Sequence, residues 1–345
     1  MGPAGVPATL VLVGGHESVG AQELRPLVER GTAFRAVTVG RELTRAVMDA
    51  LTAVPERPVC VVPMTLGRDP RLVADAARAL RWLTRERGAD VRRGDHRGAD
   101  VRGGDVRGGK RIALTEPFGS AGHLVGWLRA ATGRACADLA ADPTNAVATD
   151  RPSTGAPGPD AGATAVLLTA PAAGPFEDAE LFRVARLVRQ YGAHRWVEVA
   201  FHGGDPDLAN GVDRCRRLGA ARVLLVPAGF APAAPTPTST AAVVDGGPLL
   251  TPYAVAGVLT ARTQEALRRL REGDDGIADG LDAEHGHGYA HTHAATEPHR
   301  HHHSHDHDQH GRLHPHRHEP GATSPTGNAH AHTHSARHDV LQAHH

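Results

Sequence analysis

Aromatic residues are scarce in this sequence, where Phe, Trp and Tyr make up 3% of the 345 residues. Neither sign of charge is in excess, because Lys+Arg and Asp+Glu number 38 each. Proteins that bind nucleic acids normally present a basic face and aromatic platforms for the bases, so we expect no nucleic-acid partner. No apolar run is long enough for a membrane helix or a signal peptide, so we also expect no membrane partner.

Cysteine is equally rare. Cys60, Cys136 and Cys215 stand alone, without a Cys-x-x-Cys pair. An odd number of isolated cysteines favours neither a disulfide framework nor a cysteine-based zinc site, and it fits a protein of the reducing cytoplasm. The 40% of hydrophobic residues is enough for real cores, and the length fits two ordinary domains.

Short apolar runs alternate with amphipathic segments through most of the chain, which predicts an α/β fold with parallel sheets. The predicted strands cover residues 10–13, 34–39, 59–64 and 112–114, then 165–168, 196–201, 222–227 and 242–244. The predicted helices cover residues 19–30, 42–51, 70–87 and 124–131, then 177–191, 208–218 and 253–271. The order of elements in the second half repeats that of the first, so we predict one duplicated sheet domain with a ligand cleft between the copies.

Changes in composition set the domain boundaries. We predict a first domain over residues 1–139, a linker rich in Ala, Pro and Gly over 140–163, and a second domain over 164–272. Within the first domain, residues 85–110 are a low-complexity segment in which Gly-Ala-Asp-Val-Arg recurs, and we interpret it as a solvated loop insertion. Residues 273–345 lack hydrophobic periodicity, so we predict a tail that is disordered without metal.

The tail holds 20 of the 25 histidines, many of them in His-x-His pairs. Neutral imidazole suits Zn, Cu, Ni and Co, and a flexible chain can wrap several imidazoles around one ion, so the tail is predicted to bind metal. The alternative is a solubilising tail whose metal affinity is incidental. The predicted ligands are His285, His287, His291, His293, His301, His302, His303, His305, His307, His330, His332 and His334.

A second histidine site is predicted at the end of the first strand. There an apolar run ends on Gly14 and Gly15 and is followed by His16, Glu17 and Ser18. Ligands of parallel α/β sheets bind beyond the carboxyl ends of the strands, where His16 could accept a proton or bind a metal. Glu17 or Ser18 could orient His16, or Ser18 could cap the following helix; alternatively His16 merely begins that helix.

These residues resemble a known family. Residues 13–18, Val-Gly-Gly-His-Glu-Ser, are similar to the strand-end Gly-His-Gly-Ser motif of the class II tetrapyrrole chelatases, the sirohydrochlorin cobalt and iron chelatases. Residues 61–66 resemble the third strand of that family, and residues 197–201 and 219–227 resemble the matching part of a second repeat. The similarity covers most of residues 9–270, and histidine-rich segments also occur in the family. The implied fold is two tandem chelatase-like domains, each a small parallel sheet flanked by helices.

The sequence also departs from the family pattern. Glu17 replaces the glycine after the family histidine, residues 66–71 stand where a second histidine is expected, and residues 169–172 have lost the histidine motif. The resemblance therefore implies one working site, with His16 and Glu17 as catalytic residues, His16 also as a metal ligand, and three residues that bind the substrate. The substrate-binding residues are Ser18, Arg68 and Arg71, and the additional metal or proton partners are His123, Glu198 and His202.

The implied reaction is insertion of a divalent metal into sirohydrochlorin or a related precorrin, for cobalamin or sirohaem synthesis. We predict cobalt as the metal, with iron or nickel as alternatives, and no organic cofactor. The tetrapyrrole would be handed over to other enzymes of its pathway. Two alternatives stay open: a catalytically degenerate homologue that stores or delivers metal, and an α/β protein that binds a different ligand.

Overall fold

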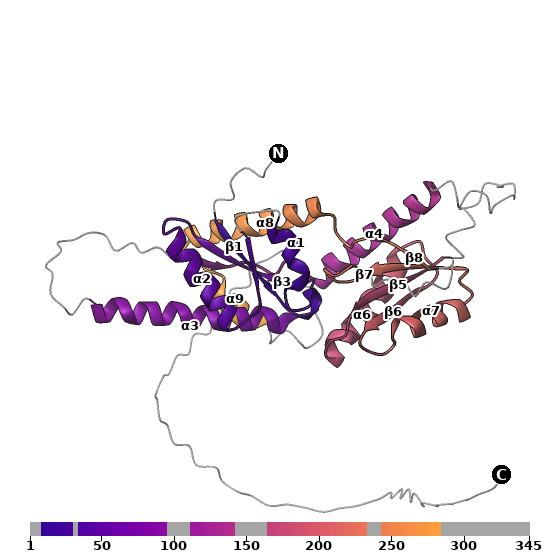
Figure 1. Cartoon of the computed structure of the whole chain (residues 1–345), viewed down its shortest axis with the longest axis horizontal. Helices are drawn as coiled ribbons and strands as arrows, with labels where there is room; N and C mark the ends of the chain where they lie inside the picture. Colours follow the sequence, from indigo (N-terminus) through magenta and orange to yellow (C-terminus); the bar gives the residue numbers. More distant parts are fainter. Residues whose placement is uncertain (1–7, 30–33, 95–110, 142–163, 233–242, 284–345) are drawn as a thin grey trace, which may run out of the picture. The chain divides into compact units, whose positions relative to one another are not determined.

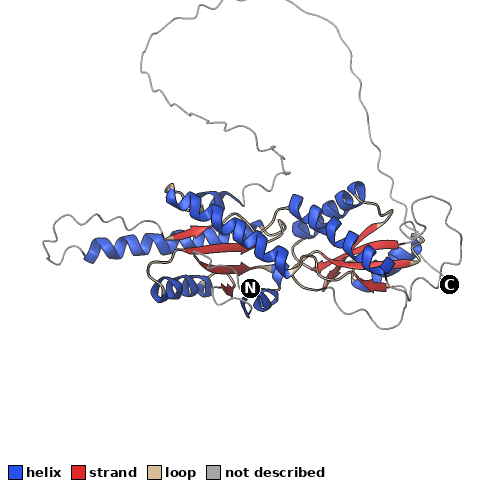
Figure 2. Ribbon diagram, turned by 90° about the horizontal axis from the view of Figure 1, so that it is seen from above, coloured by secondary structure: helices blue, strands red, loops and turns tan. Residues whose placement is uncertain are grey.

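Two four-stranded parallel sheets form the framework of the protein (Figure 1, Figure 2). The computed structural model describes residues 8–29, 34–94, 111–141, 164–232 and 243–283. The first sheet has the order β2-β1-β3-β4, from β1 (Thr9–Gly14), β2 (Phe34–Val37), β3 (Val59–Met64) and β4 (Ile112–Leu114). The second has the order β6-β5-β7-β8, from β5 (Thr164–Pro171), β6 (Val197–His202), β7 (Arg222–Pro227) and β8 (Val243–Asp245). The α/β fold, its duplication and all eight predicted strands are confirmed.

The central strands of each sheet are buried on both faces, as their continuous apolar sequences require. In β1, Leu10 and Leu12 enter one hydrophobic cluster, whereas Val11 and Val13 enter another on the opposite face. The register pairs Gly14 at the end of β1 with Met64 at the end of β3. The carboxyl ends of these two neighbouring strands therefore lie side by side, and the loops that follow them share one edge of the sheet.

Helices cover both faces of the sheets. They are α1 (Arg25–Glu29), α2 (Arg41–Ala53), α3 (Pro70–Gly94), α4 (Ala121–Ala141), α6 (Pro175–Tyr191), α7 (Leu208–Arg217), α8 (Pro252–Arg271) and α9 (Ile277–Asp282), with short 3-10 turns η1 (His16–Ser18) and η2 (Gln22–Leu24). The helix predicted over 19–30 is wrong in its first half, because Val19 and Ala21 have left-handed backbone angles, with φ of 49° and 68°. A right-handed helix cannot pass through such residues, so only α1 remains of it.

Helices α4 and α8 each pack against the other half of the chain. Helix α4 follows the first sheet in sequence but packs against α6 and β7, and the Arg134 guanidinium donates a hydrogen bond to the Leu249 carbonyl at 3.0 Å. Helix α8 follows the second sheet but packs against β3 and β4, where Arg262 forms an ion pair with Glu116. The two halves are thus interlocked through α4 and α8. The domain boundaries at residues 139 and 164 stay predictions.

The predicted loop insertion and tail both begin later than expected. Helix α3 continues to Gly94, so the segment predicted as a loop from residue 85 is helical at its start. At the other boundary, residues 273–283 belong to the fold: the Leu114 amide of β4 donates to the Asp275 carbonyl at 2.8 Å, and α9 packs against α3. The physical reason is Ile277, which is buried in the core beneath the first sheet. Residues 95–110, the linker from 142 onward and the tail histidines lie outside the described residues.

Within the described ranges, no helix combines the length and the apolar character that crossing a membrane requires.

Removing the Ile277 side chain should destabilise the protein. Ile277→Ala leaves a cavity in the core of the first sheet, and we expect a loss of about 2 kcal/mol in the free energy of unfolding. Asp282→Ala, an exposed change on the same helix, serves as the control and should have little effect. Urea denaturation measures both variants. Equal stability of Ile277→Ala and the wild-type protein would show that α9 does not contribute to the fold.

Candidate functional site

The candidate site lies at the carboxyl ends of β1 and β3. β1 ends at Gly14, and the turn after it places the His16 ring against Asp69, which follows β3. His16 Nδ1 lies 3.0 Å from Asp69 Oδ2. A Cβ atom on Gly15 would collide with Asp69 Oδ2, so a glycine at this position is what lets the two side chains meet.

Asp69 is held from several directions. Its Oδ1 accepts a hydrogen bond from the Leu72 amide at 3.0 Å, which caps the start of α3, and its own amide donates to Thr65 Oγ1 at 3.1 Å. Burial acts to raise the pKa of Asp69, but the hydrogen bonds from His16 and Leu72 and the charge of His16 outweigh it and hold the pKa below its ordinary value of 3.8. Asp69 is therefore ionised at neutral pH.

An ionised carboxylate at Nδ1 determines which nitrogen of His16 carries the proton. Nδ1–H faces Asp69, so the lone pair of the neutral ring is on Nε2. Nε2 is buried and has no hydrogen-bond partner among the described residues, while the His16 side chain as a whole is 20% exposed. This arrangement can accept a proton or bind a metal ion at one defined atom.

The Glu17 side chain is buried and links the turn after β1 to the turn after β3. Its carboxylate is fully buried, where Oε2 accepts hydrogen bonds from Thr65 Oγ1 and, at 2.9 Å, from the Leu66 amide. Burial raises the pKa of Glu17, although the nearby Arg68 charge and these hydrogen bonds act in the opposite direction. The Glu17 carbonyl also accepts a hydrogen bond from the Phe230 amide, which follows β7. The predicted catalytic role does not fit this placement; Glu17 is a positioning residue.

Arg68 is also placed differently from the prediction. Its side chain is buried, with Nε donating to the Glu177 carbonyl at 3.2 Å and Nη2 to Asp178 Oδ1 at 3.3 Å, both on α6. Burial lowers the pKa of Arg68, and the carboxylates of Glu17 and Asp178 oppose that shift. A guanidinium enclosed in this way cannot reach the carboxylates of a bound substrate, so Arg68 joins the two halves instead.

Ser18 and Arg71, the other two predicted substrate-binding residues, differ from each other in their exposure to solvent. Ser18 is buried and accepts a hydrogen bond from the Ala21 amide at 3.3 Å, so it caps the next turn and does not bind substrate. Arg71 is exposed in the first turn of α3, two residues after Asp69. Of the three predicted substrate-binding residues, Arg71 alone remains available.

The three additional partners, His123, Glu198 and His202, have contacts of their own. His123 is exposed at the start of α4, where its Nδ1 accepts from the Ser120 amide at 3.2 Å and its ring stacks on Trp127. Glu198 lies within β6 and forms an ion pair with Arg214 of α7 at 2.8 Å. His202 ends β6, and burial lowers its pKa. Nothing in these contacts connects the three residues with His16.

Asp69 and Thr65 are the residues that sequence reasoning missed. Asp69 lies in the segment that stands where the family's second histidine is expected, and Thr65 directly precedes that segment. Asp69-Pro70 before an amphipathic run is a helix-start signature, so a capping role could have been recognised, but the pairing with His16 could not. Among the described residues, no group of three or more His, Cys, Asp or Glu side chains is arranged to hold a metal ion.

Comparisons with solved structures find sirohydrochlorin chelatases. SirB from Bacillus subtilis with Fe3+ is 13% identical and has a TM-score of 0.45, covering 77% of this chain and 97% of SirB. SirB from Bacillus subtilis subspecies spizizenii, a sirohydrochlorin chelatase in complex with cobalt, is 13% identical with a TM-score of 0.38, over 78% and 97% of the two chains. CbiX, the terminal enzyme for siroheme biosynthesis in denitrifying bacteria, is 14% identical with a TM-score of 0.37, over 75% and 99%. No protein-family model and no curated protein sequence matches the chain.

Glu17→Gln should change how stability depends on pH. The folded protein holds the Glu17 proton more tightly than the unfolded chain does, so the contribution of Glu17 is fully present below its ordinary pKa of 4.5 and is lost as pH rises through the raised value. The free energy of unfolding of Glu17→Gln should therefore rise relative to that of the wild-type protein as the pH increases from 4.5 to 8. Urea denaturation at a series of pH values measures this difference.

Glu42→Gln is the matched control for this series. Hydrogen bonds from Thr38 lower the pKa of the exposed Glu42, so the contribution of Glu42 is lost as pH falls. The difference in the free energy of unfolding between this variant and the wild-type protein should be constant between pH 4.5 and 8, and should change only below pH 4.5. A Glu17→Gln curve parallel to the wild-type curve would mean that Glu17 is ionised within the folded protein.

Proposed function

We propose that this protein is a metal chelatase of the sirohydrochlorin type, which inserts a divalent metal ion into a sirohydrochlorin or precorrin-type tetrapyrrole. The observation that carries the proposal is the His16 imidazole: Asp69 holds it at Nδ1, while Nε2 has no protein partner in the described part of the chain. The strand-end motif around His16 and the duplicated parallel sheets support the same reading.

The chemistry follows from the charges. A divalent metal ion enters the ring as two pyrrole N–H protons leave. The tetrapyrrole therefore has the same net charge after metal insertion as before it, and the two protons must be accepted by a base or by solvent. His16 Nε2 is the base that collects a proton, and the Asp69 carboxylate stabilises the imidazolium that forms. The second proton passes to solvent. Because Asp69 keeps the Nδ1 proton in place, the basic lone pair is presented at Nε2 each time.

Asp69 would serve in place of the second histidine of the family. A carboxylate next to an imidazole increases its basicity and fixes its orientation, which are the properties a lone histidine needs. Arg71, exposed at the start of α3, is the arginine that we assign to the peripheral carboxylates of the substrate. The histidine-rich tail would supply or buffer the metal.

We choose cobalt as the metal, because imidazole ligands favour Co over Fe and the family uses both. The product would then enter cobalamin or sirohaem synthesis in the cytoplasm by handover to other enzymes of the pathway. A second candidate function is a degenerate chelatase homologue that stores or delivers metal. The concentration of 20 of the 25 histidines in the tail favours this candidate, as does the lack of a three-ligand group in the described residues.

The rates of metal insertion by the wild-type protein and by His16→Ala distinguish a chelatase from a metal-storage or delivery protein. Purified full-length protein is mixed with sirohydrochlorin and Co, Ni or Fe(II), and the absorbance of the tetrapyrrole is followed. We expect turnover by the wild-type protein and a rate at least about 100-fold lower for His16→Ala, since the general base is removed. His123→Ala, an exposed change on α4, is the control and should retain the wild-type rate.

Two outcomes would contradict the proposal. Full activity of His16→Ala would remove His16 from the mechanism. No insertion by the wild-type protein, together with tight metal binding, would leave the storage or delivery function.

Asp69→Asn tests the carboxylate by itself. Asparagine keeps an oxygen that can cap α3, so the thermal transition should stay close to that of the wild-type protein. Its amide NH2 can instead donate to Nδ1, which moves the ring proton to Nε2 and blocks the basic lone pair. We expect kcat to fall by about 100-fold or more with KM little changed, and the pH dependence of kcat to shift. If kcat and its pH dependence are unchanged, Asp69 only caps the start of α3 and takes no part in the reaction.

A further inference from the structure

Cys136 and His194 meet at the amino-terminal edge of the second sheet. Cys136 lies on α4, and His194 lies in the loop between α6 and β6. The Cys136 Sγ atom is 3.7 Å from His194 Nε2, and both residues are half-buried. Neither residue takes part in the chemistry assigned to His16.

The separation of the two atoms matches that of two ligands on one metal ion. With Zn–S about 2.3 Å and Zn–N about 2.0 Å at a tetrahedral angle, sulfur and nitrogen lie about 3.5 Å apart. Thiolate and imidazole are the ligands that borderline and soft transition metals prefer. A plain S–H···N hydrogen bond has a similar length, so the experiment below must separate these two interpretations.

Burial affects the ionisation of both groups. Burial lowers the pKa of His194, and its Nδ1 atom is buried without a hydrogen-bond partner among the described residues. Burial raises the pKa of Cys136, and the nearby Arg222 charge opposes that shift by favouring the thiolate.

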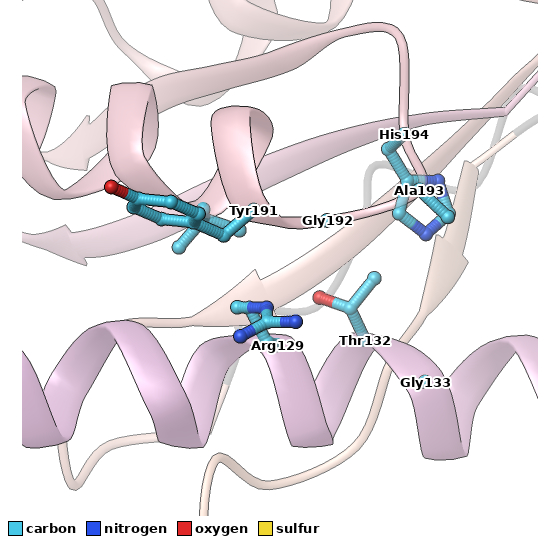
Figure 3. Close-up of a pocket in the computed structure, with 8 residues that line it drawn as sticks. Arg129, Thr132, Gly133, Tyr191, Gly192, Ala193 and His194 are labelled. Carbon is cyan, nitrogen blue, oxygen red and sulfur yellow. The ribbon is translucent and has the colours of Figure 1, made fainter.

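A cavity adjoins the pair. It has a volume of about 390 Å3 and lies between α4 and the end of α6, with His194 in its wall. Figure 3 shows Arg129 and Thr132 on α4 facing Tyr191 and His194 across it. The exposed Arg129 guanidinium is the charged group of the lining, so the space suits water or a small anion. A metal at Cys136 and His194 would thus have room for further ligands.

We propose that Cys136 and His194 bind a thiophilic divalent metal ion, such as Zn2+ or Co2+, whose remaining positions are open to this cavity. Binding releases the thiol proton of Cys136 to solvent and forms a metal–thiolate bond, while His194 coordinates through the neutral Nε2. No electron is transferred.

The proposed site is distinct from His16. Thr164 and Arg222 begin β5 and β7, so the site lies at the amino-terminal edge of the second sheet. The turn that holds His16 lies instead by the carboxyl ends of these strands, where the Phe230 amide after β7 donates to the Glu17 carbonyl. The length of β5, about 23 Å at 3.3 Å per residue, separates the two edges.

A metal at this position would fasten α4 to the second sheet. Cys136 comes from a helix that follows the first sheet in sequence, whereas His194 belongs to the second half. At its start, α4 also touches the loop after β3, since a Cβ atom on Gly67 would collide with the Ala121 amide. Metal binding would therefore stabilise the contact between the halves by an amount that grows with the logarithm of the metal concentration once the site is mostly occupied.

Titration of the reduced, full-length protein with Co2+ tests the proposal. A cobalt–thiolate bond gives charge-transfer absorption in the near ultraviolet, which imidazole ligands of the tail do not produce. We expect this band in the wild-type protein, its loss in Cys136→Ala, and its retention in Cys215→Ala, the same change at a fully buried cysteine. His194→Gln should weaken the Co2+ affinity measured from this band by at least about 10-fold.

A second measurement needs no variant. Zn2+ should slow the alkylation of Cys136, which mass spectrometry measures. The Zn2+ concentrations that protect Cys136 should be the same as those that displace Co2+ and remove the cobalt–thiolate band. Absence of the band in the wild-type protein, its persistence in Cys136→Ala, or an unchanged affinity in His194→Gln would each overturn the proposal and leave a thiol–imidazole hydrogen bond.

Discussion

The buried carboxylate of Glu17 is the contact on which the candidate site depends. It accepts hydrogen bonds from the Thr65 hydroxyl and the Leu66 amide, and so ties the turn after β1 to the turn after β3. The same hydroxyl accepts the Asp69 amide, and Asp69 in turn holds His16. Four residues therefore form one chain of hydrogen bonds from the core to the ring of His16. A buried carboxylate without such partners would be costly, and this cost makes the arrangement specific.

Arg68 extends the network to the other half of the chain. Its guanidinium is enclosed between Glu17 and α6, where Asp178 and the Glu177 carbonyl receive its hydrogen bonds. Removing one partner from such a buried group leaves an uncompensated charge, so the contact sets the position of α6 against the loop that carries Asp69. The interlocked packing of α4 and α8 acts in the same direction. The site at His16 is thus built by both halves, although its predicted reactive residue comes from the first.

Burial explains where sequence reasoning about the site succeeded and where it failed. The apolar run, the two glycines and His16 are local features, and the structure places the histidine at a strand end as predicted. The positions of Glu17 and Arg68 after predicted strands favour catalytic and substrate-binding roles, yet both side chains are enclosed. Cys136 and His194 are 58 residues apart, so their proximity has no counterpart in the spacing of the sequence.

Local sequence patterns were enough to predict the elements: apolar runs alternating with amphipathic segments indicated two parallel sheets, and the histidine content set the tail apart. These properties are local, because period and composition act within a few turns of chain. The tertiary structure alone decided that Asp69 orients His16, that Ile277 ties residues 273–283 to the first sheet, and that α4 and α8 cross between the halves. Each of these depends on which groups become buried together, and burial is a property of the whole fold.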